Sequence, residues 1–127
     1  MNVVFLIGRI ILGAYFISGG INHFSKLNFM SGYVKAKGAP APKVAVAGSG
    51  VLLILGGLSV LLGVYPLIGC ILLIIFLAGV SPVMHAYWKI QDPMARMGEM
   101  VNFTKNIALI GALLIILTIP GPWPYRW

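Results

Sequence analysis

Acidic residues are nearly absent from this chain. Among its 127 residues only Asp92 and Glu99 are acidic, against nine lysines and arginines, and all charged residues together make up 9%. Soluble domains carry roughly 25% charged residues, so a surface this poor in charge does not suit water. Because 60% of the residues are hydrophobic, the chain is predicted to be an integral membrane protein. Its length allows one transmembrane domain, 1–127, without a second.

Cysteine and metal-ligand clusters are also scarce. Cys70 is the single cysteine, which excludes an intramolecular disulfide and a CxxC redox pair. Two histidines on different segments, without a thiol or carboxylate spaced beside them, predict no metal site. The net charge is +7, but the basic residues are spread between apolar runs, which speaks against nucleic acid as a partner. No nucleophile constellation stands out, so catalytic activity is left open.

Long apolar runs predict an all-α fold, an integral membrane four-helix bundle. A membrane helix needs about 20 mostly apolar residues. Four runs qualify, at about 3–23, 44–64, 66–87 and 103–119. The turn between the second and third runs is very short, so these two helices are expected to be antiparallel neighbours in contact with membrane lipids.

The connection 25–42 carries its own pattern. Leu27, Met30 and Val34 fall on one helical face, and lysines fall on the other. This pattern predicts a short interfacial helix lying in the headgroup region. A disordered basic loop is the alternative.

Positive charge predicts the orientation. Seven lysines and arginines flank the first and third connections, and Arg9 and Arg126 belong to the other side. By the positive-inside rule, the first and third connections are cytoplasmic and both termini are outside. Aromatic residues at both ends, among them Trp88 and Trp127, fit an interfacial belt.

Arg9 is the charged residue that lies within the first apolar run. Arg9, Gly13, Phe16, Gly20 and His23 are spaced by 4, 3, 4 and 3, so they share one helical face. If this face points into the bundle, Arg9 should bond carbonyl groups of a loop or of the C-terminal segment. Otherwise it snorkels to the interface as an anchor. The glycines suit close helix packing and would also serve a homo-oligomer.

The stretch HAYWKIQDP (85–93) gathers scarce ionisable groups at the end of the third run. Antiparallel helices bring it to the same membrane depth as the end of the first run and the start of the fourth. The predicted site for a quinone or a lipid headgroup consists of His23, His85, Trp88, Asp92, Asn102 and Lys105.

These residue types suit such a ligand. A quinone needs donors to its carbonyl oxygens and an aromatic ring to stack on, and histidine can pass protons near neutral pH. His85, Trp88 and Asp92 would share one face if the helix continued, and Asp92 is the expected carboxylate partner of Lys105 or His85. Alternatively, these groups neutralise one another at the interface and fix the connection.

Five pieces, in this order and spacing, resemble the DoxX family over nearly the whole chain. They are GRIILGAYFISGGINHFSKL, GAPAPKVAVAG, GGLSVLLGVYP, MHAYWKIQDP and NFTKNIALIGALLI. The resemblance implies a small four-helix membrane protein of the prokaryotic plasma membrane. The family takes its name from a terminal-oxidase and thiosulfate:quinone oxidoreductase setting, and a receptor-assembly chaperone belongs to the wider group.

The resemblance leaves two functions open. One is an accessory subunit of a quinone-linked redox system, with quinone as the candidate cofactor and a membrane redox enzyme as partner. The other is a non-catalytic assembly factor or structural partner. Many family members carry a glutamate shortly before the glycine pair of the second helix, whereas VLLIL (51–55) is wholly apolar here. The positions that match the family pattern are Arg9, Gly13, Phe16, Gly20, His23, Gly57, Gly63, His85, Trp88, Asp92, Pro93, Asn102, Lys105 and Asn106.

Overall fold

The computed structural model describes residues 2–38 and 40–125 and confirms the predicted all-α fold. Within these residues the chain is helical and contains no strand. The elements are α1 (Asn2–Ser25), α2 (Leu27–Ala36), α3 (Pro42–Leu62), α4 (Pro66–Met84), the 3-10 turn η1 (Tyr87–Lys89) and α5 (Pro93–Leu117). In the described part of the chain, four helices are long and apolar enough to cross a membrane: α1, α3, α4 with the residues up to Lys89, and α5.

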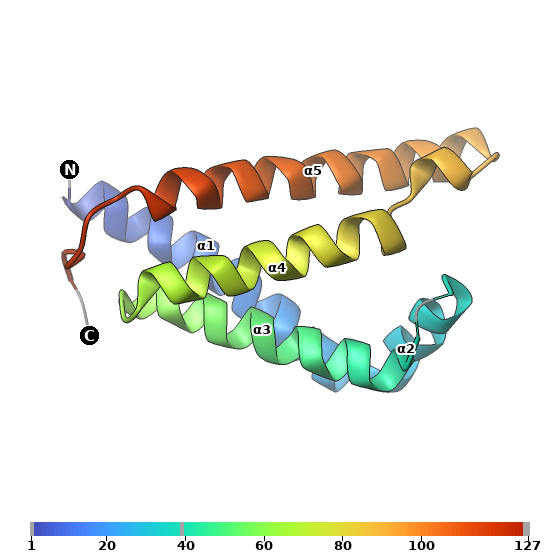
Figure 1. The fold of residues 1–127 in the computed structure, drawn as a ribbon, viewed down its shortest axis with the longest axis horizontal. Helices are drawn as coiled ribbons and strands as arrows, with labels where there is room; N and C mark the ends of the chain where they lie inside the picture. The colour runs from blue at the N-terminus through green and yellow to red at the C-terminus, as the bar shows by residue number, and fades with distance from the viewer. Residues whose placement is uncertain (1, 39, 126–127) are drawn as a thin grey trace.

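The four long helices pack in the spatial order α1, α3, α4, α5, and α2 lies against α3 (Figure 1). The start of α1 and the C-terminal segment lie at one end of the bundle, which is called the Arg9 end (Figure 1). Helices α1 and α4 finish towards the opposite end, where α3 and α5 begin, and this is called the His85 end. The core between the helices is formed by Phe16, Leu53, Val60, Cys70, Leu73, Leu77, Leu113 and Trp123.

Glycines set the close approach of α1 to α3. A Cβ atom on Gly13 would lie 2.9 Å from the Gly57 carbonyl oxygen, and a Cβ on Gly57 would lie 2.9 Å from the Gly13 carbonyl oxygen. One Cβ on Gly20 would lie 2.8 Å from the Gly50 carbonyl oxygen. The two backbones therefore touch at two levels, as small residues allow in membrane bundles.

The α2 helix forms inside the 25–42 connection. Met30 and Val34 are partly buried, whereas Lys35 is exposed, so the helix has the two unlike faces that the sequence indicates. Its placement in the headgroup region stays a prediction.

The end of α4 differs from the sequence-based expectation. His85, Trp88 and Asp92 do not share a helical face, because α4 ends at Met84 and the chain continues as η1. Pro82 lies inside the last turn of α4. Since proline lacks an N–H group and crowds the preceding turn, the end of this helix is already weakened, and the chain leaves it three residues later.

The start of α5 also differs, since the helix begins at Pro93 and the predicted fourth span begins at residue 103. Asp92 is the N-cap, and its Oδ2 accepts a hydrogen bond from the Ala95 N–H at 2.9 Å. Proline at the first helical position and an aspartate cap both favour helix initiation. The polar stretch MARMGEMVN is therefore helical, and Glu99 projects from a helix.

Candidate functional site

A cavity of about 1030 Å³ lies among the long helices towards the His85 end, and α2 contributes to its wall. Most of its lining is apolar, from residues such as Phe16, Leu53 and Phe76. A smaller group of its lining residues is polar: Ser18, Asn22, His23, Ser49, His85, Lys105 and Asn106. The cavity therefore offers a large apolar surface together with several hydrogen-bonding groups.

Two residues of α1 that line the cavity are also exposed on the surface of the bundle. Ile11 and Tyr15 line it from α1, yet they are 67% and 49% exposed. From α5, the Lys105 Nζ lies 5.9 Å from the centre of the Tyr15 ring. Helix α1 packs on α3, and α5 packs on α4. Between α1 and α5 themselves, the contact is made by side chains.

Both histidines line the cavity, and each has a partner for Nδ1. The Nδ1 of His23 lies 2.7 Å from the Gly19 carbonyl oxygen, which can only accept, so Nδ1 is the donor. The His23 ring meets Phe76 edge-on with centroids 5.9 Å apart. The Nδ1 of His85 lies 3.1 Å from Glu99 Oε2.

Glu99 links three elements at the His85 end. Its Oε2 lies near His85 and 3.8 Å from the Nζ of Lys37 at the end of α2. Its Oε1 accepts a hydrogen bond from Asn102 Nδ2 at 3.3 Å. The Glu99 side chain is only 15% exposed. These four residues are called the Glu99 cluster, and they tie α2 and the end of α4 to α5.

The expected pairing of Asp92 is wrong. Its carboxylate caps α5, and Glu99 is the acid that meets His85. The reason is the early start of α5, which turns Glu99 towards the bundle two turns into the helix. Among the described residues, Lys105 has no carboxylate within ion-pair distance, and its ammonium lies over the Tyr15 ring.

The structure brings together part of the predicted site. His23, His85 and Lys105 line the same cavity. Trp88, Asp92 and Asn102 are not part of its lining. Trp88 is 49% exposed and stacks edge-on against Tyr87 and Phe103, both with ring centroids 5.4 Å away. Asn102 donates a hydrogen bond to Glu99, and Glu99 in turn contacts the lining residue His85.

Sequence reasoning missed two contributors. Glu99 was placed in a connection, although its spacing of three residues from Asn102 fits one helical face. Tyr15 is next to Phe16, which shares a helical face with Arg9, and it lines the cavity. A hydropathy profile does not single out either residue, because the apolar residues around each of them dominate the average.

Arg9 organises the opposite end of the bundle. It is 3% exposed, and its guanidinium donates to the carbonyl oxygens of Val60 at 3.1 Å and Leu61 at 3.0 Å. It also donates to the carbonyls of Pro124 and Tyr125 in the C-terminal segment. The buried residues of α1 are Arg9, Gly13, Phe16 and Gly20, so this stripe faces the bundle. Arg126 and Trp127, which the orientation and the aromatic belt use, lie outside the described residues.

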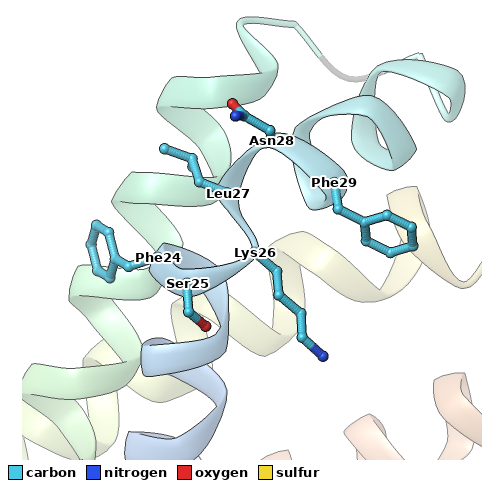
Figure 2. Close-up of a pocket in the computed structure, with 6 residues that line it drawn as sticks. All are labelled: Phe24, Ser25, Lys26, Leu27, Asn28 and Phe29. Carbon is cyan, nitrogen blue, oxygen red and sulfur yellow. The ribbon is translucent and has the colours of Figure 1, made fainter.

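A second hollow of about 660 Å³ lies at the bend between α1 and α2. It is lined by residues 24–29 alone. Figure 2 shows that Leu27, Asn28, Phe29 and Lys26 point in different directions around the bend. Since its polar groups do not converge, it is a corner of the fold and offers no binding chemistry comparable to the larger cavity.

Four membrane-length helices, with a cavity among them that has apolar and polar lining residues, define a small multi-pass membrane protein. The family model of DoxX matches residues 4–86, and the chain belongs to the DoxX family. It is similar to the inner membrane protein YphA of Escherichia coli K12, with 30% identity over 120 residues, which cover 94% of this chain and 84% of YphA. No solved structure matches the chain.

Proposed function

We propose that this protein binds a quinone in the cavity of about 1030 Å³ among the helices and acts as an accessory subunit of a membrane redox system. The observation that carries the proposal is the composition of the cavity wall. Its volume of about 1030 Å³ is at the upper end of the range typical of small-molecule sites, roughly 300–1,000 Å³. It is mainly apolar, and seven of its lining residues, among them His85, Lys105 and Asn106, offer polar side chains.

The polar groups suit a headgroup with acceptor oxygens. Lys105 supplies an ammonium, and the side-chain amide of Asn106 supplies N–H donors. His85 lies on the same wall. Neither acidic residue of the chain lines the cavity. Carbonyl oxygens of a quinone would accept from these donors, while its ring and tail would cover the apolar wall.

The aromatic side chains that line the cavity support the same ligand class. Tyr15 and Phe16 line it from α1, and Phe76 lines it from α4. Aromatic side chains prefer offset or edge-on contacts with other rings, and a quinone ring can take part in both. A purely aliphatic lipid would gain nothing specific from these rings.

A partner enzyme completes the proposal. The chain has one cysteine and therefore no dithiol pair with which to carry electrons itself. We place the protein in the plasma membrane of a prokaryote, in line with the name of the related inner membrane protein. By the positive-inside rule, the His85 end would face the cytoplasm. There the protein would hold or hand over quinone for the partner.

Quinone binding to the purified protein tests this function. The full chain is reconstituted in nanodiscs with ubiquinone or menaquinone, and binding is measured by retention and by mass spectrometry of extracted lipid. Lys105→Met should reduce retention about fivefold or more, the factor set by one lost hydrogen bond of about 1 kcal/mol. Lys89→Met is the matched control, because Lys89 is exposed in η1 and outside the cavity lining.

Two outcomes would overturn the proposal. One is absence of saturable quinone binding to the intact protein. The other is equal loss of binding in both lysine variants, which would indicate a general charge effect. In either case the non-catalytic assembly role would become the better reading of the fold.

A further inference from the structure

We infer that Glu99 is a positioning residue for His85: it holds the imidazole in one tautomer and so decides which hydrogen bond His85 offers to a ligand in the cavity. The inference rests on the proposed quinone site and names a chemical preference within it. His85 lines the cavity, whereas Glu99 does not. Glu99 therefore acts on a ligand only through His85.

The contact between the two side chains sets the tautomer. An ionised carboxylate can only accept hydrogen bonds, so the 3.1 Å contact requires the proton on His85 Nδ1. In a neutral imidazole the other nitrogen, Nε2, then carries a lone pair. His85 becomes an acceptor towards the cavity.

The carboxylate is itself held in place. Asn102 donates to Oε1 at 3.3 Å, which leaves Oε2 for His85. Lys37, at the end of α2, lies 3.8 Å from Oε2 and balances its charge. The two partners reach Glu99 from α2 and from the next turn of α5. The orientation of Glu99 is thus defined from both sides.

Several charged and titratable groups contact His85 or line the same cavity. Glu99 is its direct partner, and Lys37 is the cation beside that acid. Lys105 and His23 line the same cavity from α5 and α1. Lys105 can donate to an oxygen of the ligand, and an imidazole that carries its proton on Nδ1 accepts at Nε2. The pair is therefore complementary to a headgroup that has both an acceptor oxygen and a hydroxyl.

A hydroquinone, the reduced form of a quinone, has such hydroxyl groups, whereas the oxidised quinone has carbonyl oxygens alone. With His85 neutral, the site should bind the reduced form more tightly. Removal of the Glu99 carboxylate would free the tautomer and abolish the preference. The expected preference is about fivefold, the factor for one hydrogen bond.

Histidine-labelled protein gives a direct test. The chain has only two histidines, so ¹⁵N-histidine NMR in nanodiscs shows two sets of ring signals, and His23→Gln assigns them. At a pH where both rings are neutral, the parent should show His85 protonated at Nδ1. Glu99→Leu should shift this signal towards the mixture of tautomers. Glu99→Gln retains an acceptor oxygen and should keep the parent tautomer.

Binding of the two redox forms completes the test. Anaerobic titrations with ubiquinol and ubiquinone should show the preference in the parent and in Asp92→Asn, and its loss in Glu99→Leu. Asp92→Asn is the matched control, since it removes the other acid of the chain while asparagine keeps the cap. Thermal unfolding of each variant separates a loss of fold from a loss of preference.

The outcomes separate the two proposals. An unchanged His85 tautomer in Glu99→Leu would overturn the positioning role even if quinone binds. Retention of the ubiquinol preference in that variant would also overturn it. Absence of binding in the parent would overturn the proposed function, while the NMR measurement would still report on Glu99 and His85.

Discussion

The guanidinium of Arg9 lies 5.5 Å from the centre of the Trp123 ring, although the two residues are near opposite ends of the sequence. The same guanidinium bonds the last carbonyls of α3 and those of the C-terminal segment. One buried side chain thus joins α1, α3 and the C-terminal segment at the Arg9 end. Cation–π contacts of this kind gain strength where water is excluded.

Arg9→Lys should destabilise the protein. A lysine has three donors on a point charge and cannot reproduce the planar five-donor fork that reaches two segments at once. The expected loss is about 2–4 kcal/mol, as for one or two hydrogen bonds to a charged group, measured by thermal unfolding in detergent. Arg96→Lys is the control, because Arg96 is exposed. Equal melting temperatures for both variants would contradict the structural role of Arg9.

Gly57→Ala should loosen the α1–α3 interface. The added methyl group would meet the Gly13 carbonyl oxygen at 2.9 Å and the Ile17 backbone nitrogen at 3.0 Å. Overpacking of this kind costs about 1–3 kcal/mol. Gly111→Ala is the matched control in α5, where a Cβ meets nothing within 4 Å. It should be neutral or stabilising by up to about 1 kcal/mol, and a larger loss there than at Gly57 would count against this packing.

Asp92→Ala should affect the start of α5 and spare the ligand site. Loss of the cap to the Ala95 N–H costs about 1 kcal/mol. Hydrogen exchange of the amides in residues 94–100 should become faster, and Asp92→Asn should restore the protection. If quinone retention fell in both variants while exchange stayed unchanged, Asp92 would belong to the binding site after all.

His85 and Lys105 should act together on a bound ligand. They line one cavity from the end of α4 and from α5, so the effects of His85→Ala and Lys105→Ala on ubiquinol retention should not add. The expected coupling is about 0.5–3 kcal/mol, as found for residues that share a partner. Strict additivity would indicate that each residue only anchors its own helix at the interface.

Cysteine labelling checks the orientation. On a Cys70→Ala background, Gln91→Cys in the exposed η1–α5 connection should be shielded from impermeant thiol reagents added to intact cells. A cysteine added after residue 127 should react. The seven-to-two distribution of lysines and arginines is the physical reason. The reverse pattern would invert the protein in the membrane and leave the helical bundle unchanged.

The sequence by itself determined that the chain forms membrane helices and indicated which side of α1 is buried. Hydropathy over about 20 residues is a local property, and each helix satisfies its own backbone hydrogen bonds in lipid. The spacing of Arg9, Gly13, Phe16 and Gly20 follows from helix geometry in the same way, and these are the residues that α1 buries. The resemblance to the DoxX family could also be recognised from the sequence alone.

Only the tertiary structure decided the partners at the site. That Glu99 meets His85 depends on α5 starting at Pro93, on α4 ending at Met84, and on the packing of these two helices. Hydropathy could not show this, because the first turns of α5 are polar and a cap near Pro93 extends the helix beyond its apolar part. The set of residues that line the cavity likewise follows from the packing order of the helices. Helix packing in lipid is governed by shape and short-range contacts between distant residues, and these are not visible in a single segment.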